Sequence, residues 1–546
     1  MNSPEPAGTS AHAPDKTDPG PTSAAEGTAS GTKSPRIIRC ASDIHSVLAE
    51  FGSQGTKTKA VIILALGGIF MDAYDFSSLA FGITAIKEQF GLSGFMTGLV
   101  NASIMVGAVI GALFGGYLVD RFGRYKLFMA DMVFFVVAAI GCAVAPNEWV
   151  LIFFRFIMGI GVGLDLPVAM AFLAEFSKLK GKGNRSQRVN AWSPAWYIAT
   201  GIGYLVVLII FVSLPYDQHA ILWRLVVGFG AVPALVVLLV RRRYLAESPE
   251  WLANQGDLRA AVDVMRSHHN LDVRLAVDAG GTRATAEYDA SRAKQETTNL
   301  AGQETTNLAG QTGGSEAAGP SAQSLQTPKR GGKWSGFAEL FAPQYRVRTI
   351  VALCVSVFST FGYNAVAYGT PLIITTLFHQ TPLVTILASL VINLGFGAIG
   401  GLLGMSIVNR FGTRRITLVG FVIQAAALAL LAIVGIPTGA LVLVSVAMLA
   451  AFVFAQAGGP GANLMNYATL SYPTRLRGIG IGFNQSVLRA FSIVSLIMFP
   501  ILAGSMGTGV FWIVACAPLA GAIAVGIVKW DPTAKDVEEE NGMPNM

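Results

Sequence analysis

The sequence predicts an all-α membrane protein with twelve transmembrane helices in two halves of six, and three observations lead to this prediction. The chain of 546 residues is 53% hydrophobic and only 13% charged, whereas soluble domains carry about 25% charged residues. Its apolar runs are long enough to cross a bilayer, which takes about 20 residues of helix. These runs form two groups of six, separated by one long polar segment.

The boundaries of the spans follow from the apolar runs. We expect the first six near residues 60–86, 97–119, 127–145, 149–174, 191–213 and 221–240, and the last six near 349–378, 383–407, 416–436, 440–466, 480–504 and 509–529. The predicted organisation is a disordered tail over 1–56, an N-terminal half over 57–243, a central loop over 244–345, a C-terminal half over 346–530 and a tail over 531–546.

The polar segments carry little sign of folded structure. Residues 1–35 are rich in Pro, Ser, Gly, Ala and Thr and lack the apolar stretch of a signal peptide. The central loop begins with a helical pattern, "WLANQGDLRAAVDVMRSHH", and later contains "QETTNLAG" twice in tandem, at 295–302 and 303–310. A polar repeat of this kind cannot bury a core, so it predicts a linker; a binding motif for a partner is the alternative.

Basic residues predict the orientation of the chain. They concentrate in alternate connections between spans, at Arg121, Arg124, Lys126, Lys178, Lys180, Lys182, Arg185, Arg188, Arg241, Arg242, Arg243, Arg410, Arg414, Arg415, Arg475 and Arg477. Short basic loops stay on the cytoplasmic side. We therefore expect both termini and the central loop to be cytoplasmic, in the plasma or inner membrane of the cell, and the net charge of +7 to reflect topology rather than a nucleic-acid partner.

Motifs for metal, nucleotide or redox chemistry are missing from the sequence. The four cysteines form no C-x-x-C pattern, and none of the six histidines lies inside an apolar run. The phosphate-binding pattern G-x-x-x-x-G-K-[ST] does not occur either. We therefore expect neither a metal site, nor a cofactor, nor an enzyme.

One connection carries a specific motif. "GYLVDRFGRYK", residues 116–126, combines a tight glycine turn with an acid among three basic groups, and "MSIVNRFGTRR" at 405–415 repeats part of it with Asn409 in place of the acid. The spacing resembles the signature loop of the major facilitator superfamily, as do "RFIMGIGVG" at 155–163, "ESPEWL" at 247–252 and "YPTRLRGIGIGF" at 472–483. The resemblance implies a two-fold repeat and a cytoplasmic gate formed by Gly116, Asp120, Arg121, Gly123 and Arg124.

Charged residues inside the spans point to function, because a charge in the bilayer costs roughly 2.5–3.5 kcal/mol on insertion scales. Asp72 and Asp75 share one face of the first span, and Arg155 lies at a comparable depth in the fourth. We expect Asp72, Asp75, Asp165 and Arg155 to couple transport to protons; a structural ion pair is the alternative. Two further charges, Asp131 and Arg224, lie near span ends, where snorkelling or pairing with loop groups is expected.

A cation near mid-membrane in the second half suggests the substrate charge. Arg489 lies at about the depth of Asp165 and suits either an anionic substrate or a bridge to that acid. "FMDAYDF" and "GVGLDLPVA" resemble the first and fourth helices of phosphate:proton symporters, whereas an arginine at position 489 resembles aromatic-acid:proton symporters. The residues expected to contact substrate are Arg489, Tyr363, Asn463, Asn466, Trp196 and Tyr197.

Together these patterns predict a monomeric secondary transporter that moves a small organic anion together with protons by alternating access. Inorganic phosphate is the second candidate substrate. Two alternatives of other kinds are a receptor or sensor that binds without transporting, with the long loop as its signalling arm, and a drug/proton exporter.

Overall fold

Long apolar helices account for nearly all of the structure. A bilayer offers no hydrogen-bond partners, so a chain that crosses it satisfies its backbone groups within helices. Ten stretches of the described residues are long and apolar enough to cross a membrane. One of them, Ile479–Ile527, contains the two helices α21 and α22, and the helix α5 adds another crossing. The fold is therefore that of a twelve-helix transmembrane protein.

The structure is a computed structural model. It describes residues 36–41, 43–44, 46–47, 56–176, 185–244, 246–268, 271–276 and 335–533. The QETTNLAG repeat and the first 35 residues lie outside this part of the chain.

The N-terminal half makes its six crossings with long helices, and the last crossing bends at Gly230 between two of them. The helices of this half are α2 (Thr56–Phe90), α3 (Gly94–Phe122), α4 (Arg124–Ala143), α5 (Glu148–Phe176), α6 (Arg185–Asn190) with α7 (Trp192–Ser213), and α8 (Leu222–Phe229) with α9 (Ala231–Tyr244), the last pair preceded by the short turn η2 (Tyr216–Ile221).

The C-terminal half has more interrupted helices. Its elements are α14 (Arg346–Tyr363), η3 (Asn364–Tyr368), α15 (Thr370–Leu372) and η4 (Ile373–Leu377); α16 (Pro382–Leu390), η5 (Val391–Gly397) and α17 (Ala398–Phe411); α18 (Thr413–Val434); α19 (Leu441–Gly458) and α20 (Pro460–Leu470); α21 (Thr474–Met506), η6 (Gly507–Gly509) and α22 (Val510–Ile527). A short helix α13 (Ser335–Glu339) precedes them.

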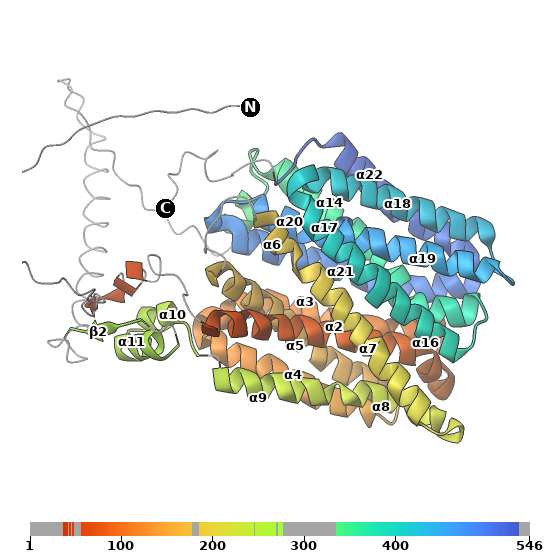
Figure 1. Cartoon of the computed structure of the whole chain (residues 1–546), viewed down its shortest axis with the longest axis horizontal. Helices are drawn as coiled ribbons and strands as arrows, with labels where there is room; N and C mark the ends of the chain where they lie inside the picture. The colour runs from red at the N-terminus through yellow and green to blue at the C-terminus, as the bar shows by residue number, and fades with distance from the viewer. Residues whose placement is uncertain are drawn as a thin grey trace, which may run out of the picture.

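The two halves lie side by side along one seam. Figure 1 shows α2, α3, α4, α5 and α9 on one side and α14, α17, α18, α19 and α22 on the other, with α7 and α21 near the boundary. Close glycine contacts keep the seam tight: a β-carbon on Gly98 of α3 would lie 2.6 Å from the Cα of Ile497 in α21, and one on Gly401 of α17 would lie 2.9 Å from the backbone nitrogen of Pro194.

Small residues also let α3 and α5 touch backbone to backbone. A β-carbon on Gly107 would overlap the carbonyl oxygen of Phe156, and one on Gly159 would overlap that of Ile104. Such close approach is the usual way for helices to pack in lipid, where apolar side chains gain little by turning inward. The α3–α5 contact forms the rigid core of the N-terminal half.

A small unit outside the bundle corrects the prediction of a wholly disordered tail over 1–56. The strand β1 (Arg36–Ile38) pairs in parallel with β2 (Val273–Leu275) of the central loop, with Ile38 opposite Leu275. The helical start of the loop forms α10 (Pro249–Asn254) and α11 (Leu258–Ser267), which lie at one end of the bundle in Figure 1. An apolar cluster joins the two segments: Ile38, Ala41, Ile44, Val47, Ala253, Ala261, Val262, Met265 and Val273.

The glycine packing of α3 and α5 can be tested by adding one methyl group. We expect Gly159→Ala to lower the midpoint of thermal unfolding in detergent, because overpacking costs about 1–3 kcal/mol. Gly504→Ala is the matched control: it lies in α21 with no atom within 4 Å of the added carbon, so its midpoint should equal that of the parent or rise slightly. Equal midpoints for the two variants would contradict the proposed close contact.

Candidate functional site

The first buried ion pair joins α2 to α5. Arg155 Nη1 donates a hydrogen bond of 3.3 Å to Asp75 Oδ1, and Nη2 lies 3.2 Å from Asp75 Oδ2. Arg155 is fully buried and Asp75 nearly so. The structure thus brings together two of the residues that the sequence marked for proton coupling. Pairing gives each charge a partner in a low-dielectric region where an isolated ion would be very unfavourable.

A second cluster of charges brings Asp131 and Asp165 of the spans together with Arg241, which the sequence predicts in a cytoplasmic loop. Arg241 of α9 binds both carboxylate oxygens of Asp131 in α4 at 3.0 Å and Oδ1 of Asp165 in α5 at 3.0 Å. It also donates to the carbonyl of Phe128 at 2.9 Å, and its guanidinium carbon lies 4.4 Å from the centre of that ring. One arginine therefore ties three helices together.

This cluster corrects two expectations. Arg241 is fully buried rather than a cytoplasmic loop charge, and Asp131 is fully buried rather than snorkelling. The helix α9 runs to Tyr244, so the first arginine of the "RRR" run still points into the bundle while Arg242 and Arg243 are exposed. The other expected span-end charge, Arg224, does pair with loop groups: it donates to the carbonyls of Ala143 and Ala145 after α4.

A fourth buried acid of the N-terminal half, Asp72, lies within electrostatic reach of both ion clusters. It is buried, and its Oδ1 has no hydrogen-bond partner in the described part of the chain. Charged groups close enough to act on it electrostatically are Asp165, Arg489, Asp75 and Arg241. Asp165 pairs with Arg241, and Arg489 lies within electrostatic reach of Asp72. The alternative of a bridge from Arg489 to Asp165 stays a prediction.

The predicted aromatic contacts meet at the seam between the halves. Trp196 of α7 donates from Nε1 to the hydroxyl of Tyr363 in α14 at 2.7 Å. Tyr197 lies edge-on to Tyr363 with ring centres 6.2 Å apart, and Phe76 of α2 lies 6.1 Å from Trp196. These rings come from both halves, so they are positioned to sense any movement of one half against the other.

The two predicted asparagines lie further along the same seam. Asn463 accepts hydrogen bonds from Asn190 of α6 at 2.9 Å and from Asn466 at 3.2 Å, and all three residues are buried. Trp192 connects them to the aromatic group: its ring lies 6.4 Å from that of Trp196, and its Nε1 donates to the carbonyl of Ala462. The labels α6 and α20 in Figure 1 place this contact near the end of the bundle at which α10 and α11 lie.

Two sequence motifs meet at that end of the N-terminal half. Gly123 has a φ of +91°, a value that favours glycine. Glu247 of the "ESPEWL" motif lies against this turn and accepts the backbone N–H of Tyr125 at 3.2 Å with each of its carboxylate oxygens. A carboxylate at the start of α4 is favourable because the helix dipole is positive there. The surroundings of Gly116 and the side chains of Asp120, Arg121 and Arg124 lie outside the described part.

The C-terminal half repeats this arrangement with a residue that the sequence left in the tail. Gly412 has a φ of +82°, and Asp531 accepts the backbone N–H of Arg414 at 3.2 Å at the start of α18. Thr533 adds a second contact through Thr413. A sequence signal existed: an acid follows the sixth span of each half.

Neutral polar groups line the interior of the C-terminal half. Gln456 of α19 accepts from Gln424 of α18 at 2.5 Å and donates to the hydroxyl of Ser359 in α14 at 2.9 Å. Next to Tyr363, the side-chain nitrogen of Asn364 is buried and has no hydrogen-bond partner in the described residues. Among the described residues, the buried ion pairs of Asp75, Asp131 and Asp165 lie in the N-terminal half, whereas this network of the C-terminal half consists of amides and a hydroxyl.

Comparison of the sequence and the structure with known proteins assigns the chain to a family of transporters. The model of the Major Facilitator Superfamily matches residues 65–495. The major myo-inositol transporter IolT of Bacillus subtilis is 25% identical over 84% of this chain and 87% of its own length. The niacin transporter NiaP of Acinetobacter baylyi is 29% identical over 37% of this chain and 44% of its own. Among solved structures, the proton:xylose symporter XylE matches with a TM-score of 0.63 and 19% identity over 89% of this chain and 99% of that one.

The Arg241 cluster predicts a large and specific loss of stability. Arg241→Met should destabilise the folded protein by about 3–5 kcal/mol, because two carboxylates stay buried without their cation. Neutralising both acids in the same chain, with Asp131→Asn and Asp165→Asn, should recover much of the loss. The measurement is thermal unfolding in detergent, and Arg242→Met, at an exposed position, is the control. If Arg241→Met has the same midpoint of thermal unfolding as Arg242→Met, the cluster does not stabilise the fold.

Proposed function

We propose that this chain, which belongs to the major facilitator superfamily, couples the uptake of a small solute to protons. In this proposal the solute is a small organic anion, and it is carried by alternating access. The proposal places α10, α11 and both termini on the cytoplasmic side of a cell membrane, in keeping with the basic loops. The observation that carries it is the position of Asp72, a buried acid whose Oδ1 has no hydrogen-bond partner among the described residues, within electrostatic reach of Arg489 from the opposite half.

The position of Asp72 near Arg489 supports coupling between proton binding and anion binding. When Asp72 is ionised, it offsets the charge of Arg489 across the seam. When Asp72 takes up a proton, that compensation is lost, and a carboxylate of the substrate is the natural replacement at the guanidinium. Proton and anion then enter together. The ion pair Asp75–Arg155 supplies a second site at which a proton and a cation compete for one carboxylate.

A neutral polyol is the second candidate substrate. The buried amides of Gln424 and Gln456 and the hydroxyl of Ser359 are groups that bind hydroxyls. Relatives are named for myo-inositol, D-xylose and arabinose, and one for niacin, so most of these names favour a polyol or sugar. A thermal-shift screen of carboxylates, polyols and inorganic phosphate would identify the class, because a ligand that binds the folded state stabilises it. Binding without flux in proteoliposomes would favour a sensor.

Coupling can be tested at Asp75. We expect Asp75→Asn to abolish accumulation of the identified solute against its gradient under an imposed pH gradient, because the amide cannot carry the proton. Counterflow, which needs no net proton movement, should be retained in part. Asp217→Asn, an exposed acid in η2, is the control and should accumulate solute like the parent. Normal accumulation by Asp75→Asn would remove this residue from the proposed route.

The charge of the substrate can be tested at Arg489. Arg489→Gln should weaken binding of the acid by roughly 10- to 100-fold, the loss of one charged hydrogen bond of about 1.5–3 kcal/mol. Arg489→Lys should bind at an intermediate level, because the charge remains while the planar fork is lost. The measurement is a titration with the acid and with its uncharged amide, and Arg415→Gln at an exposed position is the control. Equal affinity of Arg489→Gln and the parent for the acid would instead favour the polyol.

A further inference from the structure

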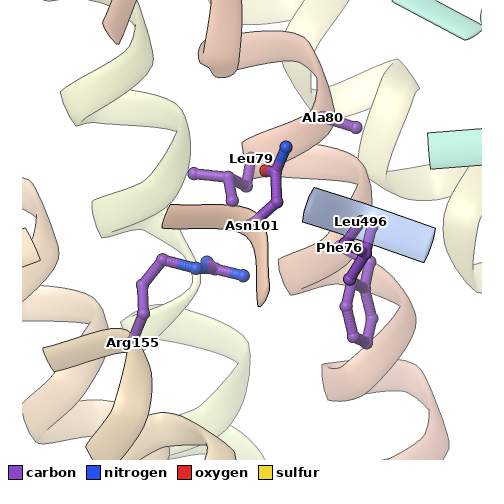
Figure 2. A pocket seen from close by; sticks show the side chains of 6 residues that line it. All are labelled: Phe76, Leu79, Ala80, Asn101, Arg155 and Leu496. Atoms are coloured by element: carbon purple, nitrogen blue, oxygen red, sulfur yellow. The ribbon is translucent and has the colours of Figure 1, made fainter. Parts of the chain in front are cut away.

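A small hollow of about 10 Å³, the space that a single water molecule needs, lies beside Arg155, the partner of Asp75. It is lined by Phe76, Leu79 and Ala80 of α2, Asn101 of α3, Arg155 of α5 and Leu496 of α21. Figure 2 shows the guanidinium of Arg155 pointing toward the other lining residues, while the amide of Asn101 points away from it, beside Leu79. Arg155 and Asn101 are the only two polar side chains among these six residues.

The ion pair leaves polar atoms unsatisfied next to this hollow. Nε and Nη2 of Arg155 and Oδ2 of Asp75 are buried and have no hydrogen-bond partner among the described residues, although Nη2 and Oδ2 face each other at 3.2 Å. Buried donors of this kind are normally satisfied by protein or by ordered water. Of the residues concerned, Arg155 lines the hollow together with Asn101, whose amide both donates and accepts. These two side chains offer the kinds of partner that a bound water needs.

The hollow is near the end of the bundle opposite α10 and α11. Arg155 comes seven residues after the start of α5 at Glu148, and Asn101 seven residues after the start of α3 at Gly94, which puts each about 10 Å from that end at 1.5 Å per residue. The proposed orientation makes this the outer side of the membrane.

Residues of both halves border the hollow. Leu496 belongs to the C-terminal half and the other lining residues to the N-terminal half. Nearer the outer end, Gly98 packs against the backbone of Ile497, and a β-carbon on Gly94 would lie 3.5 Å from the Cα of Ile501. Movement of α21 away from α3, which alternating access requires at this end, would expose the hollow to the outer solution.

We propose that this hollow is a water-filled entry site through which protons from the outer solution reach Asp75, and that Asn101 is the positioning residue that holds the water against Arg155. A hydronium ion in the hollow transfers one proton to the Asp75 carboxylate and remains as water, while Arg155 keeps its charge. This inference rests on the proposed proton coupling and deepens it. The other titratable or charged groups that act on Asp75 or its partner are Asp72 and Tyr74 on α2 and Cys142 on α4.

A carbodiimide tests the proposal without a known substrate, because it reacts with protonated carboxyl groups in apolar surroundings. Right-side-out membrane vesicles with an alkaline interior are acidified outside, and the label on Asp75 is followed by mass spectrometry, with Asp75→Asn to identify the signal. In the parent, labelling should rise with outside acidification and not with acidification of the interior alone. In Asn101→Leu, labelling should be slower by about tenfold, the change produced by a lost hydrogen bond worth roughly 1.4 kcal/mol.

Further variants separate a positioning role from a structural one. Asn101→Ser keeps a hydroxyl and space for water, and it should restore labelling, whereas Asn101→Val, a smaller apolar variant, should behave like Asn101→Leu. Gln218→Leu removes an exposed amide at the outer side and is the matched control. Unchanged labelling in both apolar variants, or labelling that follows only the inner pH, would overturn the proposal. Proton coupling itself is measured separately, as solute accumulation by the parent; if that is present and Asn101 has no effect, the proposed function stands and this inference fails.

Discussion

The contact on which the N-terminal half depends is the one in which Arg241 holds Asp131 and Asp165 together. Three helices end up fixed to one guanidinium at distances of 3.0 Å, in a region where no solvent can replace a lost partner. Breaking such a cluster requires either a new cation or a proton. The half is therefore built to move as one body, and the glycine contact between α3 and α5 has the same effect.

The hydrogen bonds described across the seam between the halves join neutral groups. Asn190 meets Asn463, Ser193 donates to the carbonyl of Ala457, and Trp196 donates to Tyr363. Neutral hydrogen bonds contribute only about 0.5–1.5 kcal/mol each, and their partners can turn to water when an aqueous cavity opens. Strong contacts within a half and weak ones between halves are the combination that rigid-body rocking requires.

The sequence was sufficient for features that depend on one segment at a time. Apolar length predicted the twelve crossings, and glycine spacing predicted the turn at Gly123. Asp75 and Arg155 were marked because charged residues are rare inside apolar runs of this length. Arg241 was missed because an arginine run at the end of a span looks like a topology signal, and only the register of α9 shows that its first member points inward. Asp531 and the strand β1 were missed because their partners are more than 100 residues away in the chain.

The pairing of β1 with β2 has a consequence for folding during synthesis of the protein. The strand before the first crossing pairs with a strand after the sixth crossing, and Arg36 lies opposite Val273. This pairing connects the two ends of the N-terminal half and uses no residue of the C-terminal half. Once residue 276 has been synthesised and has left the ribosome, all residues of this small unit are present. The N-terminal half can thus fold, with its two ends paired, while the C-terminal half is still being synthesised. The order of synthesis then sets the order in which the two halves fold.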